Sequence, residues 1–152
     1  NGAPARSKVT HLSQPSIIPP GTIDNTHLTS GIDILPTMCD YASITCPEVT
    51  GNSLRPVVEH PDLSGTSFLV SELHSDPNDL EMQGRMVRTE RYKYVAFSTG
   101  RNPEQFFDLK SDPEETRNLL QDANWRKELE AHRTLLHQWC VDTDDSFTCP
   151  IQ

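Results

Sequence analysis

Four cysteines are the residues whose type bears most directly on chemistry, and they stand at Cys39, Cys46, Cys140 and Cys149. None belongs to a Cys-x-x-Cys pair, and none stands with histidine at the spacing of a structural zinc site. Four cysteines permit two disulfides, and the sequence leaves three possible pairings open. A zinc-thiolate centre is therefore not expected, whereas an oxidising compartment is permitted.

Histidines and carboxylates supply the other candidate groups. His132 falls on the apolar face of a predicted helix, where a packed and hydrogen-bonded histidine is more common than a catalytic one. Asp144 and Asp145 are adjacent in an unpatterned tail, and a hard divalent ion needs several oxygens converging on one point, so we expect solvated carboxylates. No nucleophile elbow, P-loop or dinucleotide fingerprint occurs, which excludes serine hydrolases and nucleotide enzymes of those kinds.

Composition limits the size and the partners of the protein. The 152 residues suffice for one compact domain, and 13 Lys+Arg against 22 Asp+Glu give a net charge of -9. That charge would repel phosphate backbones and anionic lipids, so we expect no nucleic-acid partner and no membrane partner. Because 34% of the residues are hydrophobic and 12 are proline, much of the chain should be surface loop.

The hydrophobic pattern predicts the elements that must position these groups. Prolines give residues 1–26 the character of an extended arm, and helical spacing from Ser30 onward predicts a short helix over 31–42, with Ser30 and Asp33 as a capping box. Runs rich in Val, Phe and Tyr predict strands over 66–73, 85–89, 93–98 and 105–109. A long helix follows, with Asp122 as its cap and an apolar face made by Trp125, Leu129, His132, Leu136 and Trp139.

These elements predict an α+β fold. Short polar turns separate the four strands, so they should form an antiparallel meander. We expect the C-terminal helix to pack across this sheet, preceded by the proline-rich arm and the short helix.

Five segments then point to a family. They are Gly-Ile-Asp-Ile-Leu-Pro-Thr-Met (31–38), Gly-Asn-Ser-Leu-Arg-Pro (51–56), the strand pair 85–95, Glu-Gln-Phe-Phe-Asp-Leu (104–109) and Asp-Pro-Glu-Glu-Thr-Arg-Asn-Leu (112–119). Their order and spacing resemble the C-terminal region of sulfatases, in the alkaline phosphatase-like superfamily. The resemblance extends over roughly residues 17–139. It implies that residues 1–26 are a remnant of the catalytic domain and that residues 27–152 are the C-terminal subdomain.

The resemblance also implies chemistry that the chain lacks. Sulfatases use a formylglycine made from a Cys/Ser-x-Pro/Ala-x-Arg motif, beside a calcium ion held by Asp and Asn. None of the four cysteines fits that motif. We therefore expect formylglycine and calcium in the full-length enzyme, neither within this chain, and an inactive fragment.

Four residues are candidates for the site through this resemblance. Asn1, followed by Gly2, resembles the end of the family's calcium-binding segment, and Lys8 stands where a sulfate-binding lysine would follow. Glu72 and His74, expected in the loop after the first strand, are candidates for substrate contacts because that region can approach the mouth of the active site. A flexible terminus and an exposed acidic loop are the structural alternatives.

The resemblance implies hydrolysis of a sulfate monoester, on a sulfated sugar or an aryl sulfate, by a periplasmic or secreted enzyme. The partners would be the remainder of the catalytic domain and a sulfated small molecule or glycan. Two alternatives stay open: a noncatalytic binding module derived from a sulfatase, and part of a related phosphatase or phosphotransferase with a Ser or Thr nucleophile.

Overall fold

The computed structural model describes residues 21–76 and 79–148, and the chain divides into two compact units, residues 1–67 and 68–152. Each unit is a separate body with its own internal contacts. The predicted arm over residues 1–26 lies almost entirely outside the described residues, so its boundary stays a prediction. Asn1 and Lys8 lie outside them as well.

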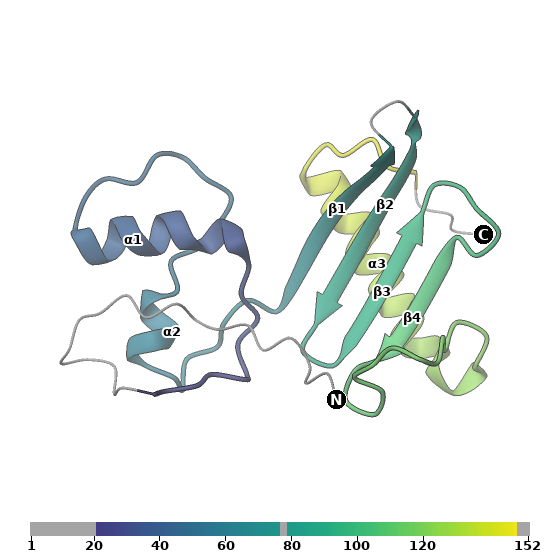
Figure 1. Ribbon diagram of the computed structural model, residues 1–152, viewed down its shortest axis with the longest axis horizontal. Helices are drawn as coiled ribbons and strands as arrows, with labels where there is room; N and C mark the ends of the chain where they lie inside the picture. Colours follow the sequence, from purple (N-terminus) through teal and green to yellow (C-terminus); the bar gives the residue numbers. More distant parts are fainter. Residues whose placement is uncertain (1–20, 77–78, 149–152) are drawn as a thin grey trace. The chain divides into compact units, whose positions relative to one another are not determined.

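The second unit is a four-stranded antiparallel sheet with one long helix. Its strands are β1 (Phe68–Asp76), β2 (Asp79–Thr89), β3 (Tyr92–Phe97) and β4 (Glu104–Asp108), in the spatial order β1-β2-β3-β4. A 3-10 turn (Ala123–Trp125) leads into α3 (Arg126–Asp142), which runs across one face of the sheet (Figure 1). The predicted meander and its covering helix are confirmed.

The register of the strands decides which side chains meet α3. Val87 lies opposite Tyr94 and Tyr94 lies opposite Phe106, which places one residue from each of three strands in a row on the same face. All three are fully buried, and they form one core with Leu129 and Leu136 of α3. The apolar side chains that recur every three or four residues along α3 therefore pack on the side chains that recur every two residues along the strands.

The first unit is built on two short helices. A 3-10 turn (Gly31–Asp33) leads into α1 (Ile34–Ala42), and α2 (Arg55–Glu59) follows the loop. The predicted capping box is present: the Asp33 carboxylate accepts a hydrogen bond from the Ser30 N–H at 2.8 Å. Pro36 is tolerated because it lies in the first turn of α1, where its missing N–H would have no partner.

The segments 31–38 and 51–56 hold each other in place. Asp33 accepts a hydrogen bond from the Asn52 N–H at 2.9 Å, and Thr37 Oγ1 accepts one from the Leu54 N–H at 2.8 Å. Gly51 passes so close to the Ile32 carbonyl that a Cβ at this position would collide with it. These contacts explain why a Gly-x-Ser-Leu loop follows an Asp-x-Leu-Pro-Thr helix start. The helix start supplies side-chain oxygens that accept hydrogen bonds, and the loop supplies the backbone N–H groups that donate them.

Two elements differ from the sequence-based prediction. The first hairpin is longer, because β2 begins at Asp79 rather than at residue 85 and β1 continues to Asp76. Asp is a poor strand former, yet Asp76 and Asp79 pair with each other across the hairpin. The helix α2 differs from the expectation that prolines mark surface loop, because Pro56 lies in the first turn of this helix, where proline is favoured.

Candidate functional site

The two substrate-contact candidates lie in the half of the first hairpin that is nearer to its turn. The expectation that Glu72 and His74 belong to a loop is wrong, because both are residues of β1, opposite Arg85 and Gln83 respectively. Both side chains are exposed, and the Glu72 carboxylate lies 3.7 Å from an Arg85 nitrogen. The structure therefore places them next to a buried cation, on the sheet face that carries the core.

Arg85 is the centre of this region. Only 3% of it is exposed, and it binds Asp145 with two hydrogen bonds, Nε to Oδ2 at 2.6 Å and a terminal nitrogen to Oδ1 at 3.0 Å. Its other terminal nitrogen donates to the Gly84 carbonyl at 2.9 Å, and its guanidinium lies 4.9 Å from the centre of the Phe147 ring. Paired donors and a stacked ring make it a structural clamp on the segment that follows α3.

The acidic pair of the tail separates into two environments. Asp144 is exposed as expected, whereas the expectation of a solvated Asp145 is wrong, because its side chain is only 10% exposed and faces Arg85. The hydrogen bonds from Arg85 hold the pKa of Asp145 below its usual value, against the opposing effect of burial. Asp145 is therefore a charged structural partner.

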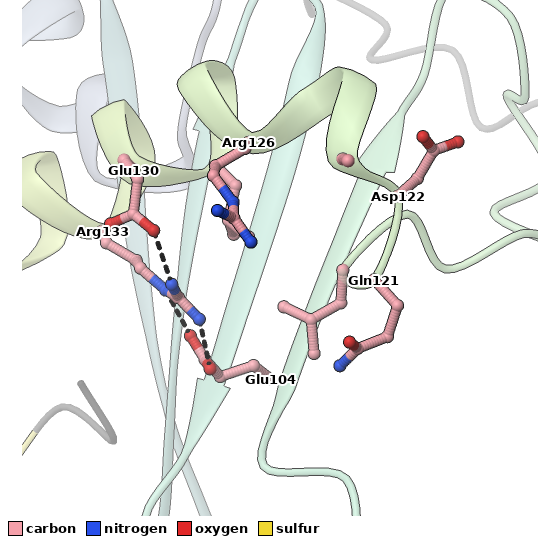
Figure 2. A pocket seen from close by; sticks show the side chains of 9 residues that line it. Glu104, Gln121, Asp122, Arg126, Glu130 and Arg133 are labelled. Atoms are coloured by element: carbon pink, nitrogen blue, oxygen red, sulfur yellow. Dashed lines mark hydrogen bonds and ion pairs between the residues drawn. The ribbon is translucent and has the colours of Figure 1, made fainter. Parts of the chain in front are cut away.

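A pocket of about 370 Å³ lies between the start of β4, the segment before α3, and α3 itself (Figure 2). Its wall contains Glu104, which accepts hydrogen bonds from Arg133 at 2.8 and 2.6 Å and from the Tyr94 hydroxyl at 2.6 Å. Arg133 also reaches Glu130 at 2.8 Å. Arg126 lines the same pocket and has no ion-pair partner among residues 21–76 and 79–148. Most charged side chains of the pocket wall are therefore paired, and the pair between Glu104 and Arg133 joins β4 to α3.

Asp108 and Asn118 hold the segments 104–109 and 112–119 in place through hydrogen bonds. The side chain of Asp108 is fully buried and accepts two hydrogen bonds from Arg91, at 2.9 and 2.8 Å, which hold its pKa well below the usual range. Asn118 accepts hydrogen bonds from the N–H groups of Phe106, at 3.0 Å, and Leu120, at 3.1 Å. These segments therefore fix how the chain leaves β4.

His132 is packed and hydrogen-bonded, as the sequence predicted. It is 5% exposed, with Nδ1 at 2.7 Å from the Glu128 carbonyl and Nε2 at 3.0 Å from the Thr89 hydroxyl. Because a carbonyl oxygen can only accept, Nδ1 carries the proton and Nε2 accepts from Thr89. Burial lowers the pKa of His132, so the neutral ring is favoured.

The described residues do not fit a divalent metal. Residues 21–76 and 79–148 contain no cluster of three or more His, Cys, Asp or Glu side chains that could hold one. One polar group does lack a partner: the Tyr41 hydroxyl at the end of α1 is buried without a hydrogen bond among these residues. In the same part of the chain, no helix has the length and apolar character needed to cross a bilayer.

Sequence reasoning missed the charged residues that organise this surface. Arg85 and Glu104 begin or precede predicted strands and looked like ordinary polar residues, and Arg133 lies beside the apolar stripe of α3. The sequence did contain one signal. Arg85 and Glu104 each stand two residues from a core residue of the same strand, so their side chains point to the same inward face. A buried charge at such a position requires a partner, which here comes from a distant part of the chain.

The sequence and the fold of this chain are similar to those of known proteins. Residues 9–140 match the family described as N-sulphoglucosamine sulphohydrolase, C-terminal. A Delta 4,5-hexuronate-2-O-sulfatase of Bacteroides thetaiotaomicron is 39% identical over 118 residues, which cover 76% of this chain and 24% of that protein. An arylsulfatase of Clostridium perfringens is 30% identical over 117 residues, covering 76% and 23%. The solved structure of a 2-O GAG sulfatase superposes with a TM-score of 0.71 at 35% identity, covering 86% of this chain and 29% of that one.

The chain spans about a quarter of the length of the curated relatives it matches. The match over residues 9–140 includes the segments 31–38, 51–56, 85–95 and 104–119 whose contacts are described above. The chain belongs to the family described as N-sulphoglucosamine sulphohydrolase, C-terminal, and the relatives that it matches are named as sulfatases.

Proposed function

We propose that the full-length protein hydrolyses sulfate monoesters of a sulfated glycan, and that this chain forms one side of its pocket. The observation that carries the proposal is the family match over residues 9–140 together with 39% identity to a hexuronate-2-O-sulfatase. The role of this chain is to support the site and to help select the alcohol part of the ester. The buried ion pairs around Arg85 and Glu104 support that role, because they hold a fixed shape and leave few reactive groups free.

We expect the groups that attack sulfur to lie in the full-length enzyme outside this chain. Formylglycine would supply the nucleophile and calcium would stabilise the sulfate charge in the full-length enzyme. The described residues fit neither group, since they contain no carboxylate cluster, and none of the four cysteines has the required motif. We expect the 152-residue chain alone to release no sulfate.

The test compares three substrates on the full-length protein. A 2-O-sulfated unsaturated uronic acid disaccharide, an aryl sulfate and an aryl phosphate are offered under identical conditions, and sulfate or phosphate release is measured. The proposal expects turnover of the sulfated sugar, weaker turnover of the aryl sulfate, and none by a variant of the upstream formylglycine motif. Release of phosphate alone would identify a phosphatase, and binding without any turnover would identify the noncatalytic module; either result contradicts the proposal.

Lys8 and Asn1 are proposed to complete the site from the start of this chain, Lys8 at the sulfate and Asn1 at the metal. The spacing of the two residues supports them. Lys8→Ala should lower kcat/KM roughly tenfold or more, because a charge-assisted hydrogen bond to an anion contributes about 1.5–3 kcal/mol. Lys127→Ala, at an exposed lysine of α3, is the control and should leave kcat/KM unchanged. Equal effects of the two substitutions would remove Lys8 from the site.

Glu72 and His74 are proposed to contact the part of the substrate away from the sulfate. Their exposure in the half of the first hairpin nearer to its turn supports this role. His74→Ala should raise KM for the sulfated sugar and leave kcat for the small aryl sulfate unchanged, because only the larger substrate would reach it. His137→Ala, at an exposed histidine of α3, is the matched control.

The remainder of the catalytic domain is the proposed partner of the first unit. Ile34, Leu35 and Met38 of α1 are 46–55% exposed, and the Tyr41 hydroxyl is buried without a partner among the described residues. An apolar stripe beside an unsatisfied hydroxyl is the kind of surface that further polypeptide would cover. We also propose that the protein is periplasmic or secreted, which fractionation of the native cells would test.

A further inference from the structure

Cys39 and Cys46 lie on either side of the turn that ends α1. Cys39 is a residue of the helix and is 4% exposed, whereas Cys46 follows the turn and is partly exposed. Six residues separate them in the sequence, a distance at which side chains meet only if the chain reverses direction between them.

The chain does reverse there. Ser43 adopts the left-handed conformation, with φ of 55°, and closes the helix by donating its N–H to the Asp40 carbonyl at 3.1 Å. The Ile44 N–H then donates to the carbonyl of Cys39 itself, also at 3.1 Å. These two hydrogen bonds turn residues 44–46 back toward the cysteine of the helix.

The turn makes Cys39 and Cys46 neighbours that are close enough for each thiol to affect the other, and both cysteines are free in this structure. Burial, followed by the neighbouring Cys39, raises the pKa of the Cys46 thiol, so Cys46 is not arranged as a low-pKa reactive thiolate. The described residues also provide no third ligand that would turn the pair into a metal site. Two neighbouring thiols can be oxidised to a disulfide with each other.

We infer that Cys39 and Cys46 form a disulfide that fastens the end of α1 to the loop after it. The more exposed Cys46 would react first: its thiolate attacks one sulfur of an external protein or glutathione disulfide and releases one thiol. The Cys39 thiolate then attacks the Cys46 sulfur and releases the second thiol, so two protons and two electrons leave the pair and reduce one external disulfide.

The position of the bond gives it a structural consequence. The loop that it would close includes Asp40, whose carboxylate accepts hydrogen bonds from Ser53 at 2.7 Å and Arg55 at 3.2 Å. The disulfide would therefore restrain the same turn of helix on which the Gly-x-Ser-Leu loop rests. It does not depend on the proposed sulfatase activity.

Tyr41 lies between the two cysteines and allows a direct test. The full-length protein is equilibrated with oxidised glutathione, its free thiols are alkylated under denaturing conditions, and the chain is cleaved with chymotrypsin at Tyr41. The inference expects the peptides carrying Cys39 and Cys46 to remain joined, with a mass lower by two hydrogens than their sum, and to separate on reduction. Alkylation of both cysteines, or a link from either of them to Cys140 or Cys149, would overturn it.

Two matched variants control the experiment. Cys46→Ser should abolish the joined peptides and leave Cys39 alkylated, whereas Cys140→Ser, at a buried cysteine of α3, should leave the joined peptides intact. Because the wild-type protein alone gives the decisive peptide map, a variant that fails to fold does not remove the test.

Discussion

Buried charge in this protein is held by individual partners, and Arg85 with Asp145 is the clearest case. Asp145→Asn would leave the guanidinium of Arg85 buried with Glu72, at 3.7 Å, as its remaining carboxylate. Breaking a buried pair costs about 3–5 kcal/mol, and Glu72 offsets part of that, so we expect a loss of roughly 2–4 kcal/mol in the free energy of unfolding. Urea denaturation measures it.

Asp144→Asn is the matched control, since it makes the same chemical change one residue earlier at an exposed side chain. We expect a change within about 0.5 kcal/mol there. If the two substitutions have the same effect, the pair between Arg85 and Asp145 contributes nothing to stability.

The same pair predicts how stability responds to acid. Arg85 lowers the pKa of Asp145 in the folded protein, whereas the unfolded chain titrates near the ordinary value of about 3.9. The unfolded state therefore binds more protons below about pH 4, and the stabilisation present above that pH is lost as the pH falls. Urea midpoints measured from pH 5 to pH 2 should fall less steeply in Asp145→Asn than in the parent chain.

His132 predicts a second loss of stability at a higher pH. Burial lowers its pKa, so the unfolded chain, with a pKa near 6.5, takes up a proton before the folded chain does. The contribution of His132 is full above about pH 6.5 and decreases as the pH falls below that value. His132→Gln should flatten the urea midpoint between pH 7 and pH 5, while His137→Gln, at an exposed position of the same helix, should leave the slope unchanged.

Residue roles were predictable where local spacing determines them. His132 was predicted to be packed because it falls on the apolar stripe of its own helix. Asp145 was predicted to be solvated because its partner, Arg85, stands 60 residues earlier in the sequence. A hydrogen bond over that separation depends on the register of the sheet and the end of α3 together, and no local pattern carries both.

At the level of elements, Glu104 and Arg133 join β4 to α3. Glu104 is 8% exposed, and the side-chain partners described above are Arg133 and the Tyr94 hydroxyl. Arg133→Met would remove the first of these and leave the second. We expect it to cost about 2–4 kcal/mol in the free energy of unfolding, because a buried charge loses its counterion. Arg126→Met, at an exposed arginine of the same helix, should change stability by less than about 0.5 kcal/mol.

A double-mutant cycle separates the pair from the packing of the arginine stem. Replacing Glu104 with Leu in the Arg133→Met background should recover much of the loss, since no unpaired carboxylate remains. Strictly additive losses would show that the two side chains do not interact.

The elements themselves were predictable where hydrophobic periodicity is strong. The spacing of Leu129, His132 and Leu136 located α3, and the alternation from Tyr92 to Phe97 located β3. The first six residues of β2 and the helix α2 were missed, because Asp79 and Pro56 are locally unfavourable signals. Pairing with β1 supports the first, and the position of proline at a helix start permits the second.

At the level of the whole molecule, the sheet unit and the helical unit differ in how much hydrophobic core each of them buries. The sheet unit has its own core around Tyr94, Phe106 and Leu136, all fully buried. Among residues 21–67, the described part of the helical unit, Cys39 is the one buried hydrophobic residue, while several apolar side chains of α1 are exposed. These exposed side chains form the surface that we propose the remainder of the catalytic domain covers.

Met38 tests that dependence. It is 49% exposed on α1, four residues after Ile34, so both side chains lie on the same face of the helix. In the 152-residue chain, Met38→Glu should change the free energy of unfolding by less than about 0.5 kcal/mol, because an exposed side chain tolerates a charge. In the full-length protein the same glutamate would be buried without a partner where further polypeptide covers α1. There we expect local stability, measured by native-state hydrogen exchange of α1, to fall by roughly 2 kcal/mol or more. The two contexts control each other, and equal effects in both would mean that the exposed face of α1 stays in water and that the remaining three quarters of the protein pack elsewhere.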